Sequence, residues 1–298
     1  MNAMQPQQGI ARELSLSEVF SKTFEIFRQG FKKYFVLFVV VEAIIGVVTA
    51  IAQKAFILPT LSSNPTPEQL FSWLPAFFGA LIPLVAMIGI VSVIFFPIAQ
   101  GSAIKLASEQ IENKETQLGA LVRYAASKLL SIWALNLIFG VIVILGFIAL
   151  VIPGIILAIM YALSFPILLL EDKGILESMG RSRELVRHRW LKTFGTFFIF
   201  AIIVAIASGI VSALSGPFGI ASPVVSGILS AFYQPLFPIL LVVYYYSNCA
   251  RVSLGPASQT QPAPTTTTQA GMRFCINCGT QMPYPARFCP NCGAKQPA

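Results

Sequence analysis

The chain has 298 residues, of which 56% are hydrophobic and only 11% are charged. Soluble globular domains carry about 25% charged residues, so this composition excludes an ordinary soluble protein and indicates a membrane protein. The formal net charge of +8 is compatible with nucleic-acid binding or with the basic loops that orient membrane proteins. The first 33 residues contain no apolar run followed by a small-residue cleavage site, so no signal peptide is expected.

The apolar segments predict six membrane spans. A bilayer core of about 30 Å is crossed by about 20 helical residues. The uncharged runs 129–170 and 193–248 are each too long for one span, and each contains a turn signal, Pro153-Gly154 in the first and the segment SGPFGIASP (215–223) in the second. A five-span arrangement with one re-entrant segment is the alternative. The predicted spans are about 34–52, 73–98, 129–151, 153–170, 193–214 and 223–248.

The basic residues are distributed asymmetrically between the predicted connections. Of the 20 Lys and Arg residues, all but Lys54 lie before the first span, after the sixth, or between spans two and three or four and five. The positive-inside rule places these segments on the cytosolic side, so both termini are expected to be cytosolic in a multi-pass protein of the cell membrane. This distribution accounts for the net charge without nucleic acid, which we do not expect as a partner.

Two of the basic segments, about 15–33 and 174–192, have the spacing of amphipathic helices. The first carries an apolar stripe at Leu16, Phe20, Phe24, Phe27 and Phe31. Basic faces beside aromatic stripes favour an anionic cytosolic leaflet as the binding surface. The residues predicted to face that leaflet are Lys22, Arg28, Lys32, Lys33, Arg181, Arg183, Arg187, Arg189 and Lys192.

The two segments also align with each other at an offset of 159 residues, which pairs Glu18 with Glu177 and Arg28 with Arg187. The alignment predicts two parallel repeats, an arrangement known in membrane proteins with a central pathway. The alternative is that two independent basic helices, each preceding a span, share similar composition.

A family resemblance rests on the run GFIALVIPGIILAIMYALSFPILLLEDKGILESMGRSRELVRHRWLKTFG and on the opening ELSLSEVFSKTFEIFRQGFKKY. Together they resemble the membrane domain of glycerophosphoryl diester phosphodiesterases and related uncharacterised prokaryotic integral membrane proteins, over about residues 12–250. The catalytic part of such phosphodiesterases is a separate soluble barrel, and nothing in this chain is long enough to form one. The resemblance therefore implies a membrane architecture and no catalysis.

Glu42 is the only acidic residue deep inside a predicted span. A charge at that depth costs several kcal/mol, so such residues are often functional, protonated or paired. Glu42 is thus a candidate proton or cation site, or else a protonated side chain hydrogen-bonded between helices or lying at a shallower depth. Asn136 and Gln234 are predicted to form interhelical hydrogen bonds.

No residue pattern predicts an enzyme. Glu171 and Asp172 are expected to form salt bridges with Arg181 or Arg183, with metal-assisted lipid chemistry as the alternative. The single histidine, His188, has no partner in the sequence pattern, and no serine lies in a G-x-S-x-G turn.

The tail contains two Cys-x2-Cys pairs. Residues 253–272 lack charge and apolar periodicity, which predicts a disordered linker between a membrane domain at 1–252 and a small module at 273–295. Four thiolates with this spacing suit tetrahedral Zn²⁺, and the module resembles the small zinc ribbons at the ends of many prokaryotic proteins. Disulfides are disfavoured in a reducing cytosol. The predicted zinc ligands are Cys275, Cys278, Cys289 and Cys292.

The expected fold is an all-α polytopic membrane helical bundle of about six spans with a small C-terminal β-hairpin zinc ribbon. Two functions follow as hypotheses. In the first, the bundle is a scaffold that presents the zinc ribbon to a cytosolic protein partner. In the second, the bundle is a transporter or a lipid-handling domain with Glu42 in its pathway. The sequence does not indicate an oligomeric state.

Overall fold

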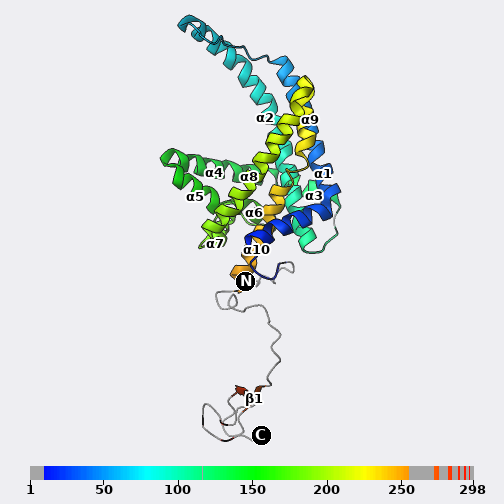
Figure 1. The fold of residues 1–298 in the computed structure, drawn as a ribbon, viewed down its shortest axis with the longest axis vertical. Helices are drawn as coiled ribbons and strands as arrows, with labels where there is room; N and C mark the ends of the chain where they lie inside the picture. Colours follow the sequence, from blue (N-terminus) through cyan, green and yellow to red (C-terminus); the bar gives the residue numbers. More distant parts are fainter. Residues whose placement is uncertain are drawn as a thin grey trace. The chain divides into compact units, whose positions relative to one another are not determined.

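The computed structural model describes residues 10–115, 117–254, 272–274 and 281–283, together with positions 288, 292 and 295. Contacts within the chain divide it into two units, Met1–Leu254 and Gly255–Ala298. The described part of the first unit is a helical bundle, whereas the second contains two short strands, β1 (Met272–Phe274) and β2 (Gln281–Pro283) (Figure 1). The helices of the first unit are α1 (Leu16–Ala55), α2 (Pro67–Ile111), α3 (Leu118–Ser127), α4 (Leu129–Ala149), α5 (Val151–Met160), α6 (Ser164–Leu170), α7 (Ile175–Val186), α8 (Trp190–Ser215), the 3₁₀ helix η1 (Gly216–Ala221), α9 (Ser222–Ser230) and α10 (Leu236–Leu254).

Five helical stretches in the described residues are long and apolar enough to cross a membrane, which confirms the predicted class of fold. They are Leu16–Ala55, Pro67–Ile111, Leu129–Ala149, Val151–Leu170 and Trp190–Ser230. The last stretch contains the predicted turn, since η1 separates α8 from α9 and Gly219 has a positive φ of 54°. The sixth predicted span does not form a single helix, because it is divided between α9 and α10.

The predicted surface helix at 15–33 and the first predicted span form one continuous helix, α1. Its start is set by a capping box, in which Ser15 Oγ accepts from Glu18 N–H and Glu18 Oε2 accepts from Ser15 N–H at 2.7 Å. The 40 residues of α1 contain no proline, and the helix rises about 60 Å along its axis. The predicted surface helix and the predicted span are therefore joined without a break in the helix, and the dark-blue start of α1 runs at a large angle to the part that follows it (Figure 1).

The buried face of α1 lies beside the predicted stripe rather than on it. Val19, Ile26 and Tyr34 are nearly inaccessible, whereas Phe24 is 46% exposed. The side chain of Tyr34 also donates to Gln110 Oε1 on α2 at 2.7 Å. The aromatic residues of the predicted stripe are thus only partly used to pack the bundle.

The helix α2 continues through three prolines, Pro75, Pro83 and Pro97. One backbone carbonyl that loses its usual N–H partner at a proline instead accepts a hydrogen bond from a side chain of another helix. Pro97 lacks the N–H that would bond to the carbonyl of Val93. The indole Nε1–H of Trp133 on α4 donates to that carbonyl at 2.8 Å. Backbone groups freed by proline in a membrane helix require such partners, so this bond explains how the helix tolerates Pro97.

The helices α4 and α5 form a hairpin that projects sideways from α1 and α2 (Figure 1). The chain turns at Leu150, which has extended backbone angles, and not at the predicted Pro153-Gly154. Pro153 instead lies in the first turn of α5, where a missing N–H has no cost. Gly154 permits close contact with α4, because a Cβ there would lie 2.6 Å from the ring of Phe147.

The helix α10 occupies the centre of the bundle, and residues 239–246 are almost completely buried. Three consecutive tyrosines, residues 244–246, contact three different elements, since neighbouring residues on a helix point about 100° apart. The first hydroxyl bonds to Thr193 on α8 at 2.8 Å, and the second donates to Glu171 at 2.8 Å. The third donates to Glu112 at the end of α2.

Candidate functional site

A polar cavity of about 430 Å³ lies between α1, α8 and α9. Its wall contains a carboxylic acid, an amide and several hydroxyl groups, although all three helices belong to apolar candidate spans. The polar lining residues are Glu42, Thr49 and Gln53 on α1, Ser208, Ser212 and Ser215 on α8, Ser222, Ser226 and Ser230 on α9, and Tyr233 beyond α9.

Each helix contributes one face to the cavity. Positions three, four or seven residues apart lie on one side of an α-helix. The serines at 208, 212 and 215 follow this spacing on α8, and those at 222, 226 and 230 follow it on α9. The cavity is therefore formed by two serine rows that meet the Glu42 face of α1.

Glu42 is buried, with 9% exposure, where α9 packs closely against α1. The side chain of Gln234 forms a hydrogen bond with its carboxyl group. Gln234 lies in the break between α9 and α10, so this contact joins that break to α1. A Cβ at Gly227 would lie 2.7 Å from the backbone oxygen of Glu42, so the absence of a side chain there permits this approach.

The end of the cavity near Glu42 coincides with the break between α9 and α10. Tyr233 lies in this break, and its hydroxyl is 3.0 Å from Ser208 Oγ and 3.4 Å from Ser230 Oγ. The ring of Phe232, next to it, is 4.7 Å from Phe35 between centroids. An aromatic contact and a discontinuous helix thus lie at this end of the polar space.

The opposite end of the cavity lies toward the C-terminus of α1. From Glu42 to Gln53 the helix rises about 16 Å, at about 1.5 Å per residue. Gln53 is exposed, and Ser215 and Ser222 flank η1 on the neighbouring elements. The cavity therefore extends from the end of the span to the depth of Glu42.

The basic residues predicted to face the membrane divide into two groups. Lys22 forms an exposed ion pair with Glu25, and the side chains of Arg28, Lys32 and Lys33 are exposed on α1. Arg183 and Arg187 are exposed on and after α7. The other three predicted residues, Arg181, Arg189 and Lys192, form ion pairs with acidic residues of the bundle.

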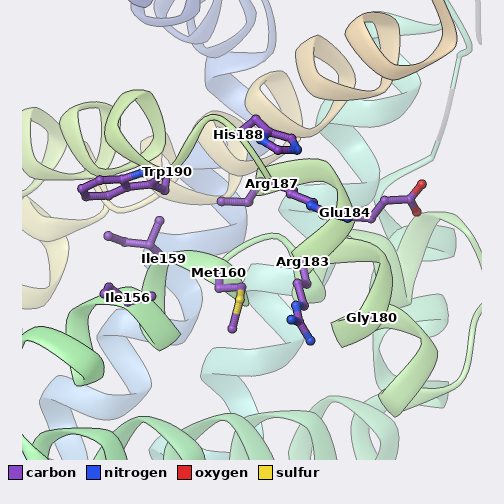
Figure 2. A pocket seen from close by; sticks show the side chains of 10 residues that line it. Ile156, Ile159, Met160, Gly180, Arg183, Glu184, Arg187, His188 and Trp190 are labelled. Atoms are coloured by element: carbon purple, nitrogen blue, oxygen red, sulfur yellow. The ribbon is translucent and has the colours of Figure 1, made fainter. Parts of the chain in front are cut away.

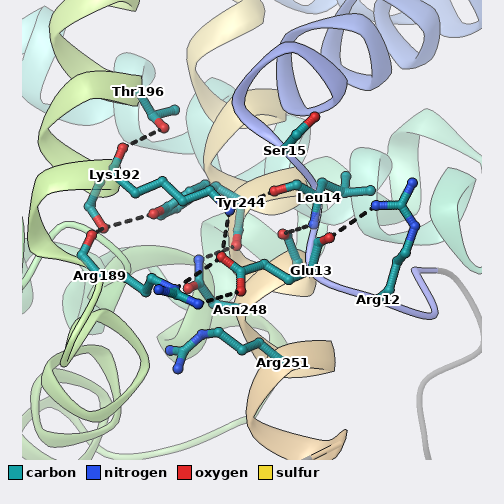
Figure 3. A network of polar contacts seen from close by, with 12 residues as sticks. Arg12, Glu13, Leu14, Ser15, Arg189, Lys192, Thr196, Tyr244, Asn248 and Arg251 are labelled. Atoms are coloured by element: carbon teal, nitrogen blue, oxygen red, sulfur yellow. Dashed lines mark hydrogen bonds and ion pairs between the residues drawn. The ribbon is translucent and has the colours of Figure 1, made fainter. Parts of the chain in front are cut away.

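Glu13 forms ion pairs with both Arg189 and Lys192 (Figure 3). Its side chain is 15% exposed, with Lys192 Nζ at 2.5 Å and Arg189 Nε at 3.2 Å. Lys192 also donates to the carbonyl of Leu14 at 2.7 Å. These contacts attach the segment before α1 to the start of α8, and nothing in the sequence pattern distinguishes Glu13 from the other acidic residues.

The two acidic residues after α6 form ion pairs, and of the two predicted arginines Arg181 lies near Glu171. The Glu171 side chain has no exposed area and lies 2.7 Å from Lys173 Nζ and 3.7 Å from Arg181 Nε. Asp172 pairs with Lys128 at 2.5 Å. The lysine holds the pKa of Asp172 below its usual range through a hydrogen bond and its charge.

In the second unit, the described residues form two antiparallel backbone pairings. The strands β1 and β2 are antiparallel, with Phe274 opposite Gln281, and an antiparallel bridge joins Phe288 to Lys295. In the sequence, one Cys-x2-Cys pair lies between the two paired strands and the other lies between the two bridged residues, and this spacing suits Zn²⁺ held by four thiolates.

Of the four predicted ligands, only Cys292 lies within the described residues, and it is exposed. Cys275, Cys278 and Cys289 lie outside them, as does most of the predicted linker. The described residues alone contain no group of three or more His, Cys, Asp or Glu side chains that could hold a metal.

Two family models match the chain. Residues 116–248 match a domain of unknown function, DUF7847, and residues 270–296 match the zinc-ribbon domain. The second match confirms the predicted ribbon. The resemblance to the membrane domain of glycerophosphoryl diester phosphodiesterases is not shown. No curated protein and no solved structure matched this chain.

Proposed function

We propose that the membrane domain binds a small cationic solute in the cavity around Glu42 and carries it across the membrane. The observation that supports this proposal is a buried carboxyl group at one end of a hydroxyl-lined cavity between apolar helices. A charge within the bilayer is costly, and a bound cation would offset the charge of Glu42. The volume of about 430 Å³ lies in the range of small-molecule sites, about 300–1,000 Å³.

The break between α9 and α10 supports translocation rather than binding alone. Solute sites in transporters lie near the bilayer midplane, beside discontinuous helices whose parts can move separately. With both termini in the cytosol of a cell, as the basic residues favour, the cavity extends from the outer end of α1 to Glu42. The break and the Phe35–Phe232 contact then lie between Glu42 and the cytosol, where a gate is required.

The test measures the current from proteoliposomes adsorbed on a solid-supported membrane. The current is recorded after the concentration of choline, methylammonium or sodium is raised suddenly. Wild-type protein is expected to give a current with at least one of these cations. Glu42→Gln keeps the shape of the side chain but removes its charge, so that current is expected to fall at least tenfold.

Two serine variants provide a matched comparison. Ser212→Ala removes a hydroxyl from the cavity and is expected to weaken binding severalfold, whereas Ser92→Ala removes one from α2, outside it. The proposal fails if Glu42→Gln retains the wild-type current, or if the two serine variants weaken binding equally.

A second candidate function is supported by the zinc-ribbon match and by the antiparallel pairing of β1 with β2 and of Phe288 with Lys295. In this function the membrane domain anchors the ribbon, which contacts a cytosolic protein partner. Deletion of residues 255–298 is expected to abolish recovery of that partner after crosslinking, while membrane insertion continues. Equal recovery with and without the ribbon would argue against this function.

A further inference from the structure

A second cavity, of about 600 Å³, lies between α5, α7 and the start of α8 (Figure 2). Ile156, Ile159 and Met160 form an apolar wall on α5. Arg183 and Arg187 supply positive charge from the opposite side. The cavity shares no lining residue with the one around Glu42.

The position of α7 over this apolar wall is determined by Ser182. Its hydroxyl donates to the carbonyl of Met160 at 2.9 Å and accepts from the N–H of Leu163 at 3.1 Å. These two bonds satisfy backbone groups at the break between α5 and α6 and attach α7 there. Arg183, the next residue, is therefore held beside Met160 (Figure 2).

The positive charge of the cavity is not neutralised by its own acidic residue. Glu184 pairs with Arg181 at 2.7 Å and points away from Arg183 (Figure 2). No acidic side chain in the described part of the chain forms an ion pair with Arg183 or Arg187. An anion is thus the complementary ligand.

The cavity also has the polarity profile of a membrane–water interface. The apolar wall belongs to the candidate span Val151–Leu170, and the arginines belong to the polar connection that follows it. Trp190, which also lines the cavity, is 54% exposed, and exposed tryptophans are typical of the interfacial region. A ligand that fits both parts has a charged head and an apolar chain.

We propose that this cavity binds one anionic phospholipid, with its phosphate between Arg183 and Arg187 and an acyl chain against Ile156 and Ile159. A zwitterionic lipid fits less well, because its own quaternary amine neutralises the phosphate and meets the arginines. The site goes beyond the proposed solute pathway and does not depend on Glu42.

The experiment is native mass spectrometry of the full-length protein titrated with phosphatidylglycerol, phosphatidylcholine or glycerol 3-phosphate. Wild-type protein is expected to retain one phosphatidylglycerol in preference to the other two ligands. A basic residue near an anionic surface contributes about fivefold to affinity, so the Arg183→Gln, Arg187→Gln double variant is expected to bind about 25-fold more weakly.

The matched control is the Arg28→Gln, Lys32→Gln double variant, which removes the same charge from α1, outside the cavity. Retained phosphatidylglycerol binding in this control supports the site, as does retention when the two arginines are replaced by lysines. Equal loss in the control, equal binding of phosphatidylcholine, or equal binding of glycerol 3-phosphate would each overturn the proposal.

Discussion

Replacing Glu13 by glutamine is expected to lower the free energy of unfolding by about 2 kcal/mol. The substitution keeps the size of the side chain and removes the charge that faces Lys192 at 2.5 Å and Arg189 at 3.2 Å. Hydrogen bonds to charged groups contribute about 1.5–3 kcal/mol, and loss of one partner also leaves the others without compensation. The 15% exposure of Glu13 and the 41% exposure of Arg189 place the expected value below that of a fully buried pair.

The measurement is denaturant unfolding of purified protein in detergent, followed by tryptophan fluorescence. The matched control is Glu25→Gln, which removes a carboxylate that pairs with Lys22 while 41% exposed. Exposed pairs contribute about 0–1 kcal/mol, so this control is expected to change stability by less than about 0.5 kcal/mol. Equal destabilisation by the two variants would show that burial does not determine how much these ion pairs contribute to stability.

The same contact predicts a dependence on pH. Burial raises the pKa of Glu13, but the hydrogen bonds and charges of Lys192 and Arg189 outweigh burial, and the pKa lies below its ordinary value of 4.5. A carboxyl group with a lowered pKa stabilises the folded state above pH about 4.5, and this stabilisation is lost as the pH falls through the folded-state pKa. The difference in stability between wild type and Glu13→Gln is therefore expected at pH 7 and is expected to shrink as the pH falls below about 4.5.

Two further predictions concern the packing around Glu42 and the ribbon. Gly227→Ala is expected to destabilise the bundle by about 1–3 kcal/mol, because the new methyl group meets the α1 backbone. An added Cβ at Gly209 would have no atom within 4 Å, so Gly209→Ala is expected to stabilise α8 slightly. A change in stability of the same sign in both variants would contradict the close packing at Gly227. Purified protein is expected to hold one zinc per chain, lost in the Cys275→Ser, Cys278→Ser variant and retained in Cys249→Ser, as measured by elemental analysis. Full zinc content in the double variant would contradict this assignment.

The class of fold could be predicted because length and hydropathy are local properties. The ends of the helices could not be predicted from length and hydropathy in this way. Pro153 reads as a breaker in sequence, yet it is tolerated in the first turn of α5, so the turn lies at Leu150 instead. The last predicted span, 223–248, contains no charged residue, and its hydropathy does not show that the helix is interrupted at residues 231–235, between α9 and α10.

The candidate site was only partly predictable. Glu42 is conspicuous as an acidic residue in an apolar run, and Gln234 as an amide in another. The cavity that surrounds Glu42 depends on the meeting of α1 with α8 and α9, which no single segment encodes. The serine spacing at 208, 212 and 215, and again at 222, 226 and 230, was the available signal.

The central position of α10 also bears on how the bundle is assembled. Ribosomes deliver the chain from the N-terminus, so α2, α6 and α8 are made before the three tyrosines that contact their ends. Until residues 244–246 arrive, Glu112 and Glu171 lack their tyrosine hydroxyl partners. A chain that stops before α10 therefore lacks the element that joins its other helices, so the bundle is expected to close only once α10 is in place.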